Sequence, residues 1–122
     1  MLCPCGTGLD VDACCGPVLA GTPAATAEAL MRSRFTAFSL GDVAHLTVSW
    51  APETRPSNVT VDPAQRWTRL EVIDTVKGLQ LDTEGVVEFR AHFERNGQAG
   101  IRAERSRFRR EAGRWVYVDG ED

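Results

Sequence analysis

The sequence predicts an α+β fold in which helices pack against one face of a curved antiparallel sheet. Apolar residues recur at helical spacing only in the first half of the chain, and with a period of two from Trp67 onward. The dipeptide Asn96-Gly97 adds the strongest short signal for a β-hairpin. The chain has 122 residues, a net charge of −3 and 25% charged residues, which is ordinary for one globular domain.

All four cysteines lie among the first fifteen residues, which makes this the most distinctive segment of the chain. Four thiolates in so short a loop match the tetrahedral ligand set of a structural zinc ion, with bonds of about 2.3 Å. Gly6 and Gly8 let the backbone turn sharply between the ligands. We therefore predict one structural Zn²⁺ in a knuckle and connector that span residues 1–21, with the ligands Cys3, Cys5, Cys14 and Cys15.

Two alternatives remain open for these thiols. Disulfides allow about three pairings, but they need an oxidising compartment. The first residues have neither a basic segment nor an apolar run typical of an export signal, so a cytoplasmic location is expected. A redox or catalytic role is less favoured, because no histidine or lysine lies nearby to activate a thiol. We favour the metal site on these grounds.

A long helix is predicted from the N-cap residue Thr26 to Gly41, a natural C′ residue. Its apolar stripe consists of Ala27, Leu30, Met31, Phe35 and Phe38. Residues 16–22 before it are expected to be a connector, and three prolines predict a loop over 52–63. Asp42 is expected to cap a second, short helix with His45 on its polar flank and with a buried side of Val43, Leu46, Thr47 and Trp50.

Four antiparallel strands are expected after the loop. The first contains Leu70 and Val72, with a bulge where the apolar Ile73 follows directly. The others are predicted over residues 86–95, 101–110 and 115–118, and the turns are at Asn96-Gly97 and Ala112-Gly113. Together with the helices they form a second unit, residues 22–122.

The register of the predicted hairpin has a chemical consequence. A two-residue turn at Asn96-Gly97 pairs odd positions with even ones, so the core-side face would carry Arg102, Glu104 and Ser106. A slip of one residue would turn them to solvent instead. Arg34 likewise falls on the apolar stripe of the long helix. Because a buried unpaired charge is costly, Arg34 and Glu104 should form a pair or share the wall of a pocket.

The pocket candidates are Arg34, Trp50, Arg55, Glu104 and Ser106. No catalytic residue is assigned, because the two histidines form no recognisable triad or cluster. Between Arg102 and Arg114 the chain has six arginines and two glutamates. We favour a solvated strand face for this stripe, with contact to an anion or RNA as the alternative. No segment reaches the roughly 20 apolar residues that cross a bilayer, so no membrane association is expected.

Two segments of the chain resemble known families. Cys3-Pro4-Cys5-Gly6-Thr7-Gly8, closed by Cys14-Cys15-Gly16, resembles the SEC-C zinc motif, with Cys15 where that motif typically has histidine. The rest is similar to the uncharacterised bacterial YchJ-like family. The similarity lies in the segments 26–35, Thr54-Arg55-Pro56, Glu104-Arg105-Ser106-Arg107-Phe108 and Gly113-Arg114-Trp115.

The YchJ resemblance implies a nuclear transport factor 2-like (NTF2-like) cone, in which a curved sheet wraps around helices. Such cones often hold a small-molecule pocket and occur in isomerases, dehydratases and pure binding modules, so the fold leaves open whether the protein is an enzyme. A zinc-stapled binding module is our first hypothesis, with a protein partner on the knuckle as the SEC-C resemblance implies, or a small ligand in the cone.

The second hypothesis is an enzyme or ligand carrier. Arg34 or Arg55 would hold an anionic group, and Glu104 would act as acid or base. It requires a hollow cone with a cavity of about 300 Å³ or more, and a solidly packed cone excludes it. The third is weak nucleic-acid or ribosome contact through the arginine-rich strand, although the negative net charge makes nucleic acid an unexpected partner.

Overall fold

The computed structural model describes all 122 residues. Its elements, in chain order, are a 3₁₀ turn η1 (Val11–Ala13), the helices α1 (Cys15–Leu19), α2 (Ala27–Leu40) and α3 (Val43–Val48), and the strands β1 (Gln65–Lys77), β2 (Glu84–Arg95), β3 (Gln98–Glu111) and β4 (Arg114–Glu121). The expected order of helices followed by an antiparallel meander is confirmed.

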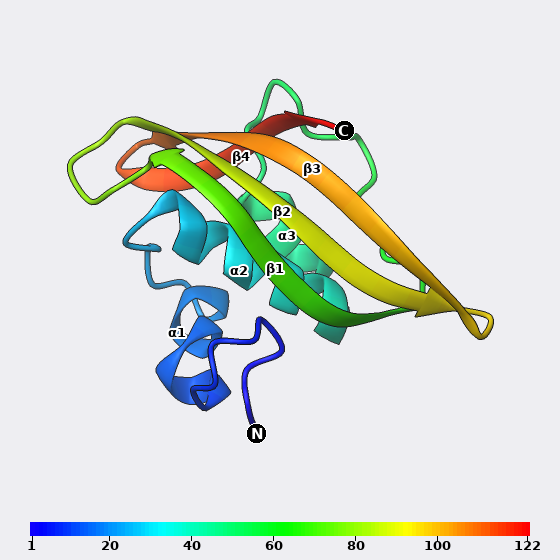
Figure 1. Cartoon of the computed structure of the whole chain (residues 1–122). Coiled ribbons are helices and arrows are strands. Elements are labelled where there is room, and N and C mark those ends of the chain that lie inside the picture. Colours follow the sequence, from blue (N-terminus) through cyan, green and yellow to red (C-terminus); the bar gives the residue numbers. More distant parts are fainter.

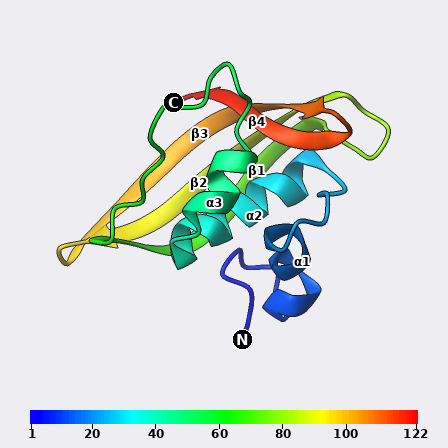
Figure 2. The ribbon, with the colours of Figure 1, turned by 180° about the vertical axis from the view of Figure 1, so that it is seen from behind.

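The strands form one antiparallel sheet in the order β1-β2-β3-β4. The sheet is long and curved, and α2 and α3 lie against its concave side (Figure 1). Seen from behind, α1 and the N-terminal segment lie beneath α2, on the side away from the sheet (Figure 2). The molecule therefore has three layers, which are the sheet, the α2–α3 pair and the cysteine-rich segment.

Bulges account for the curvature of the sheet. The β1–β2 register shifts between Trp67 and Arg69 and again between Val72 and Asp74, so that Thr68 and Ile73 are the extra residues. The second shift confirms the bulge expected at Ile73. Each extra residue increases the local twist and bends the strand, which curves the sheet over α2.

Two tight turns set the register of the remaining strands. Asn96 and Gly97 have φ angles of 53° and 78°, and Ala112 and Gly113 have 50° and 82°. Positive φ at both central residues is the geometry of a type I′ hairpin turn. Arg95 pairs with Gln98 as expected, so Phe89 opposes Glu104 and Ala91 opposes Arg102. The core-side placement of Glu104 and Ser106 is confirmed by their burial.

Helix α2 has the boundaries that its caps predict. The Thr26 side chain accepts a hydrogen bond from the backbone N–H of Ala29, and Gly41 adopts a left-handed conformation with φ of 75°. Residues Ala27, Leu30, Met31 and Phe35 of the predicted stripe are buried. Arg34 is buried among them, as its position on that stripe required.

Two expectations about the short helices were wrong. Residues 16–22 are not only a connector, because α1 occupies Cys15–Leu19; Pro17 fits its first turn, where no backbone N–H is needed. In α3 and its C-cap Ser49 the buried residues are His45, Leu46 and Ser49; of the expected buried side only Leu46 is confirmed, whereas Val43 is exposed and Thr47 and Trp50 are half-buried. The physical reason is that α2 presents Ser33 and Arg34 to α3, and these polar groups need hydrogen-bonding partners there.

The cysteine segment shares its core with the rest of the chain. Cys3, Cys5 and Cys15 belong to one buried cluster with residues of α2 and of the sheet, such as Leu30 and Leu70. The division into units 1–21 and 22–122 stays a prediction. None of the helices is both long and apolar enough to span a bilayer.

Candidate metal centre and ligand cavity

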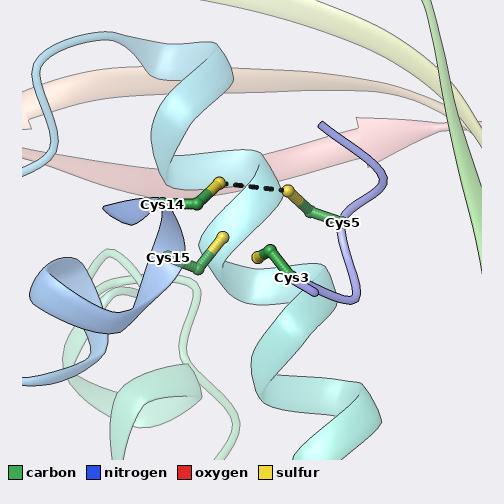
Figure 3. A group of neighbouring side chains, drawn as sticks. All are labelled: Cys3, Cys5, Cys14 and Cys15. Carbon is green, nitrogen blue, oxygen red and sulfur yellow. Dashed lines mark hydrogen bonds between the residues drawn. The ribbon is translucent and has the colours of Figure 1, made fainter. Parts of the chain in front are cut away.

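The four cysteine sulfur atoms converge on one point. All lie within 4.8 Å of one another, the cysteines are free of disulfides, and Cys5 Sγ and Cys14 Sγ are 3.5 Å apart. Figure 3 shows the four side chains pointing toward a common centre beside α2. Four sulfurs at 2.3 Å from one ion would be separated by about 3.8 Å, so this arrangement fits a tetrahedral site with small adjustments.

Local sequence explains how the ligands are brought together. The backbone N–H of Cys3 donates to the Leu9 carbonyl at 2.8 Å, which closes the loop between the first and second pairs of cysteines. Asp10 caps η1 by accepting from the N–H of Asp12, which places Cys14 and Cys15 at the start of α1. A Cβ atom at Gly16 would lie 2.7 Å from the Val11 carbonyl oxygen, so only glycine fits beside Cys15.

The thiols also shift one another's acidity. Hydrogen bonding by the Cys15 thiol is the main cause that lowers the pKa of Cys5 to about 4. The same interaction and burial raise the pKa of Cys15, and burial raises that of Cys14. The cluster thus stabilises one thiolate by itself. Further thiolates at this spacing repel one another, and a divalent cation removes that repulsion.

Helix α2 contacts the cluster through two polar side chains. Arg32 Nη1 donates to the Cys5 carbonyl at 2.9 Å, and its Nε pairs with Glu28 at 2.9 Å. Thr36 Oγ1 lies 3.6 Å from Cys3 Sγ. These groups orient the ligand-bearing loop, as residues around metal sites commonly do. The residues present therefore fit a soft divalent metal ion held by four sulfurs.

A second feature lies on the opposite side of α2, where the cone is hollow. A cavity of about 290 Å³ separates α2 from the concave face of the sheet. Its apolar wall is mainly aromatic and is formed by Met31, Phe35, Phe38, Trp50, Trp67, Phe89, Ala91 and Phe108. Its polar groups come from Arg34, Gln65, Arg102, Glu104, Ser106 and Tyr117.

Glu104 is held in the wall by three donors. Its Oε1 accepts from the Tyr117 hydroxyl at 2.6 Å and from Ser106 Oγ at 3.1 Å, and its Oε2 faces Arg102 Nη2 at 3.3 Å. Gly120 lies directly behind this carboxylate, since a Cβ there would be 1.7 Å from Oε1. Burial and then the Glu104 carboxylate raise the pKa of Tyr117, so the hydroxyl keeps its proton and remains a donor.

Arg34 is the buried basic group of the cavity. Its Nη1 donates to the Leu46 carbonyl at 3.0 Å and to Ser49 Oγ at 2.6 Å. The guanidinium carbon lies 4.9 Å from the Trp50 ring centre and 4.7 Å from that of Tyr117, in cation–π contact. Burial lowers the pKa of Arg34 to about 10, so the group is still charged at neutral pH.

The structure brings four of the five pocket candidates together: Arg34, Trp50, Glu104 and Ser106 all line the cavity. Arg34 and Glu104 share its wall but form no ion pair, because the Tyr117 ring lies between them. Arg55 is not part of the lining; its Nη2 donates to the Trp50 carbonyl at 2.9 Å.

Several residues of this site, among them Gln65, Tyr117 and Ser49, are absent from the predicted pocket candidates. Tyr117 could have been identified, because the register already put it on the same face as Glu104. Ser49 carried no such signal, because its contact with Arg34 depends on how α3 packs on α2. His45, expected on a polar flank, is buried instead, with Nε2 2.9 Å from Ser33 Oγ. Neither histidine lines the cavity.

The arginines of the arginine-rich strand have partners within the protein. Arg105 pairs with Asp74 and Glu88, Arg107 with Asp119, and Arg109 with Glu53 and Glu111. Arg110 and Arg114 donate to backbone carbonyls of neighbouring segments. These ion pairs lie at the surface, where each contributes little to stability.

Comparison with known proteins gives consistent results. The family model of the YchJ middle NTF2-like domain matches residues 26–120. A UPF0225 protein of Streptomyces coelicolor is 50% identical over 98% of this chain and 94% of its own length. A UPF0225 protein of Chromobacterium violaceum is 46% identical over 97% of this chain and 90% of its own length.

Two solved structures share the fold over both the cysteine segment and the cone. The solution structure of a SEC-C motif containing protein from Rhodopseudomonas palustris has a TM-score of 0.86 and 37% identity, covering 99% of this chain and 98% of that one. A SEC-C motif containing protein from Psychrobacter arcticus has a TM-score of 0.75 and 26% identity, covering 96% and 80%. The chain belongs to the UPF0225 family of YchJ-like proteins, with an NTF2-like domain preceded by a SEC-C-type cysteine cluster.

Proposed function

We propose that this protein is a zinc-stapled binding module whose cone accommodates a small ligand. The observation that carries the proposal is the cavity of about 290 Å³ on the concave side of the sheet. A tightly packed interior would contain few voids larger than a water molecule. A cavity of this size, with mainly aromatic walls and a few buried polar groups, is the usual form of a small-molecule site.

We favour binding over catalysis because Glu104 and Ser106 are already engaged in hydrogen bonds within the protein. Catalysis would need Glu104 to exchange a proton with a substrate, yet three donors already hold this carboxylate. Ser106 is fully buried and donates to Glu104, so its hydroxyl is not available as a nucleophile. An enzyme that uses Glu104 as acid or base is the alternative to this binding module.

An NMR fragment screen tests the ligand site. Fragments that enter the cone should shift the backbone amide signals of Ala91, Glu104 and Tyr117, while amides of the cysteine segment remain unmoved. Ala91 is 3% exposed and lines the cavity, so Ala91→Phe should fill it and abolish these shifts. A screen in which no fragment moves these signals in the wild type would contradict the proposal.

Zinc is the metal proposed for the four sulfurs, and its role is structural. Four-coordinate, all-cysteine sites without an open position are typical of structural zinc, and free thiols fit the reducing cytoplasm. We propose that the ion holds residues 1–21 as a staple on the unit 22–122. Protein purified under reducing conditions should contain one zinc per chain by elemental analysis. Iron in its place, or oxidised cysteines without metal, would contradict this assignment.

Exposed apolar residues on the knuckle favour a protein partner as a second function. Met1, Leu2 and Leu9 are 71%, 69% and 51% exposed and lie on the loop that carries Cys3 and Cys5. A photoreactive amino acid at position 9 should crosslink to one discrete protein in cells. Leu81, which is 97% exposed on the β1–β2 connection, provides the control position. Equal crosslinking from both positions would argue against a docking site on the knuckle.

A further inference from the structure

The guanidinium of Arg34 has hydrogen-bonding capacity that the protein does not use. Nη1 has two acceptors, but Nε and Nη2 have none. A few buried nitrogen and oxygen atoms of this protein have neither a hydrogen-bonding partner nor any exposed surface, but none of them belongs to Arg34. The unpaired Nε and Nη2 of Arg34 therefore keep some exposed surface. Since Arg34 lines the cavity, its Nε–Nη2 edge faces the empty space.

Arg34 is also a charge without a counter-ion. It is the one arginine that is fully buried, at 5% exposure, and no carboxylate lies within ion-pair distance of it. Glu104 cannot play that part, because its oxygens are occupied by Tyr117, Ser106 and Arg102. Its two hydrogen bonds and its contacts with the Trp50 and Tyr117 rings offset only part of the cost of burying a charge that has no counter-ion.

The charges that line the cavity define what it can accept. Arg102 pairs with Glu104 and, at 3.8 Å, with the exposed Asp122, so the positive charge that has no carboxylate beside it is that of Arg34. A single negative charge on a ligand pairs with Arg34, whereas the second charge of a dianion would lie in the same cavity as the Glu104 carboxylate. The planar Nε–Nη2 edge of a guanidinium matches the two oxygens of a carboxylate.

The remaining walls determine the body of the ligand. Phe35, Trp67 and Phe89 contribute flat apolar surfaces, which suit an aromatic or similarly apolar group. The volume of about 290 Å³ lies at the lower end of the range for ligand pockets, so the body is limited to one or two rings. The Arg102 side chain is 57% exposed and marks where the cavity opens to solvent.

We infer that the cone binds a small monoanion, with its carboxylate on the free edge of Arg34 and its apolar, ring-containing body against the aromatic wall. This inference rests on the proposed function of the cone as a ligand site. It adds the chemical class of the ligand and the residue that recognises it. Arg34 then gains in the complex the counter-ion that the free protein does not provide.

Three probes of equal shape and different charge test the inference. They are 2-naphthoate, the neutral 2-naphthamide and the cationic 2-naphthylmethylammonium, with dissociation constants measured by NMR titration of the zinc-loaded protein. Naphthoate should bind at least tenfold more tightly than the amide, which corresponds to about 1.4 kcal/mol, and the ammonium should bind most weakly.

Variants connect the preference to Arg34. Arg34→Met should remove at least tenfold of the affinity for naphthoate and leave that for naphthamide nearly unchanged. Arg90→Met is the control, because it removes an exposed arginine outside the cavity lining and should leave both affinities unchanged. Glu104→Gln keeps acceptors for Tyr117 and Ser106 but removes the negative charge, so naphthoate should bind severalfold more tightly. This variant decides the question if Arg34→Met does not fold.

The outcomes separate this inference from the proposed function. Equal binding of amide and naphthoate, tighter binding of the ammonium, or unchanged naphthoate affinity in folded Arg34→Met would overturn the assignment of an anion while leaving a ligand site in the cone. If none of the three probes moved the signals of cavity residues at millimolar concentration, both the ligand site and this inference would be contradicted.

Discussion

Replacing Tyr117 with phenylalanine removes one hydroxyl from the wall of the cone and keeps the aromatic ring. That hydroxyl donates to Glu104 Oε1 at 2.6 Å, and Glu104 is 8% exposed. The ring packs on Trp50 and Phe108 with centroid distances of 5.2 and 5.8 Å, and these contacts do not involve the hydroxyl. The substitution therefore isolates one hydrogen bond to a buried carboxylate.

The expected cost follows from that geometry. A hydrogen bond to a charged group contributes about 1.5–3 kcal/mol to stability. Ser106 still donates to the same oxygen at 3.1 Å, so Oε1 keeps one donor. We expect the free energy of unfolding to fall by about 2 kcal/mol. For a domain of this size, that lowers Tm by roughly 6–10 °C.

Urea unfolding of the zinc-loaded protein, followed by circular dichroism, measures this loss. The midpoint should fall while the m value stays constant. Arg102→Gln is the control, because it removes a longer, 3.3 Å contact from an exposed side chain to the same carboxylate and should cost less than about 1 kcal/mol. A loss in Tyr117→Phe no larger than that in Arg102→Gln would refute the reasoning.

Three further predictions concern Tyr117 and the cysteine cluster. Tyr117 is the only tyrosine, and because burial and then Glu104 raise its pKa, its absorbance at 295 nm should titrate above the ordinary value of 10 in the folded protein. The raised pKa means that folded protein binds more protons than unfolded protein above pH 10, so stability should fall there as pH rises, and less so in Tyr117→Phe. Gly16→Ala should weaken zinc binding at least tenfold in a competition assay, because the new methyl group would meet the Val11 carbonyl; unchanged affinity would contradict the observed packing. Removing zinc with a chelator should move the NMR signals of residues 1–21 to random-coil positions, while the strand amides keep their protection from hydrogen exchange. Loss of the sheet signals would contradict a separable staple.

Much of the fold could be predicted because its determinants are local. Asn96-Gly97 fixes a two-residue turn, and with side chains alternating along a strand, the turn alone placed Glu104 and Ser106 on the core side. Thr26 and Gly41 set the ends of α2 through contacts within one turn of the helix. The spacing of the cysteines limited their chemistry before their positions were known, since few other arrangements are open to four thiols in fifteen residues.

The face of α3 and the state of Arg34 could not be predicted, because they depend on residues distant in sequence. Ser49 and Leu46 supply acceptors to Arg34 only because α3 crosses α2 at that point, and this crossing buries His45 and exposes Val43. Apolar periodicity takes no account of such hydrogen bonds, since it ranks side chains by hydrophobicity alone.

The sequence by itself determined the helix-then-sheet order, the register of β2 with β3 and the close spacing of the cysteines. Only the tertiary structure decided that the cone is hollow and that Arg34 faces its interior without a counter-ion. Turns, caps and close ligand spacing act over a few residues, and their effects are written in short segments of the chain. A cavity is the space that remains between a curved sheet and the side chains beneath it. Its size depends on the curvature of the whole sheet and on the summed volume of those side chains, and no single segment determines either.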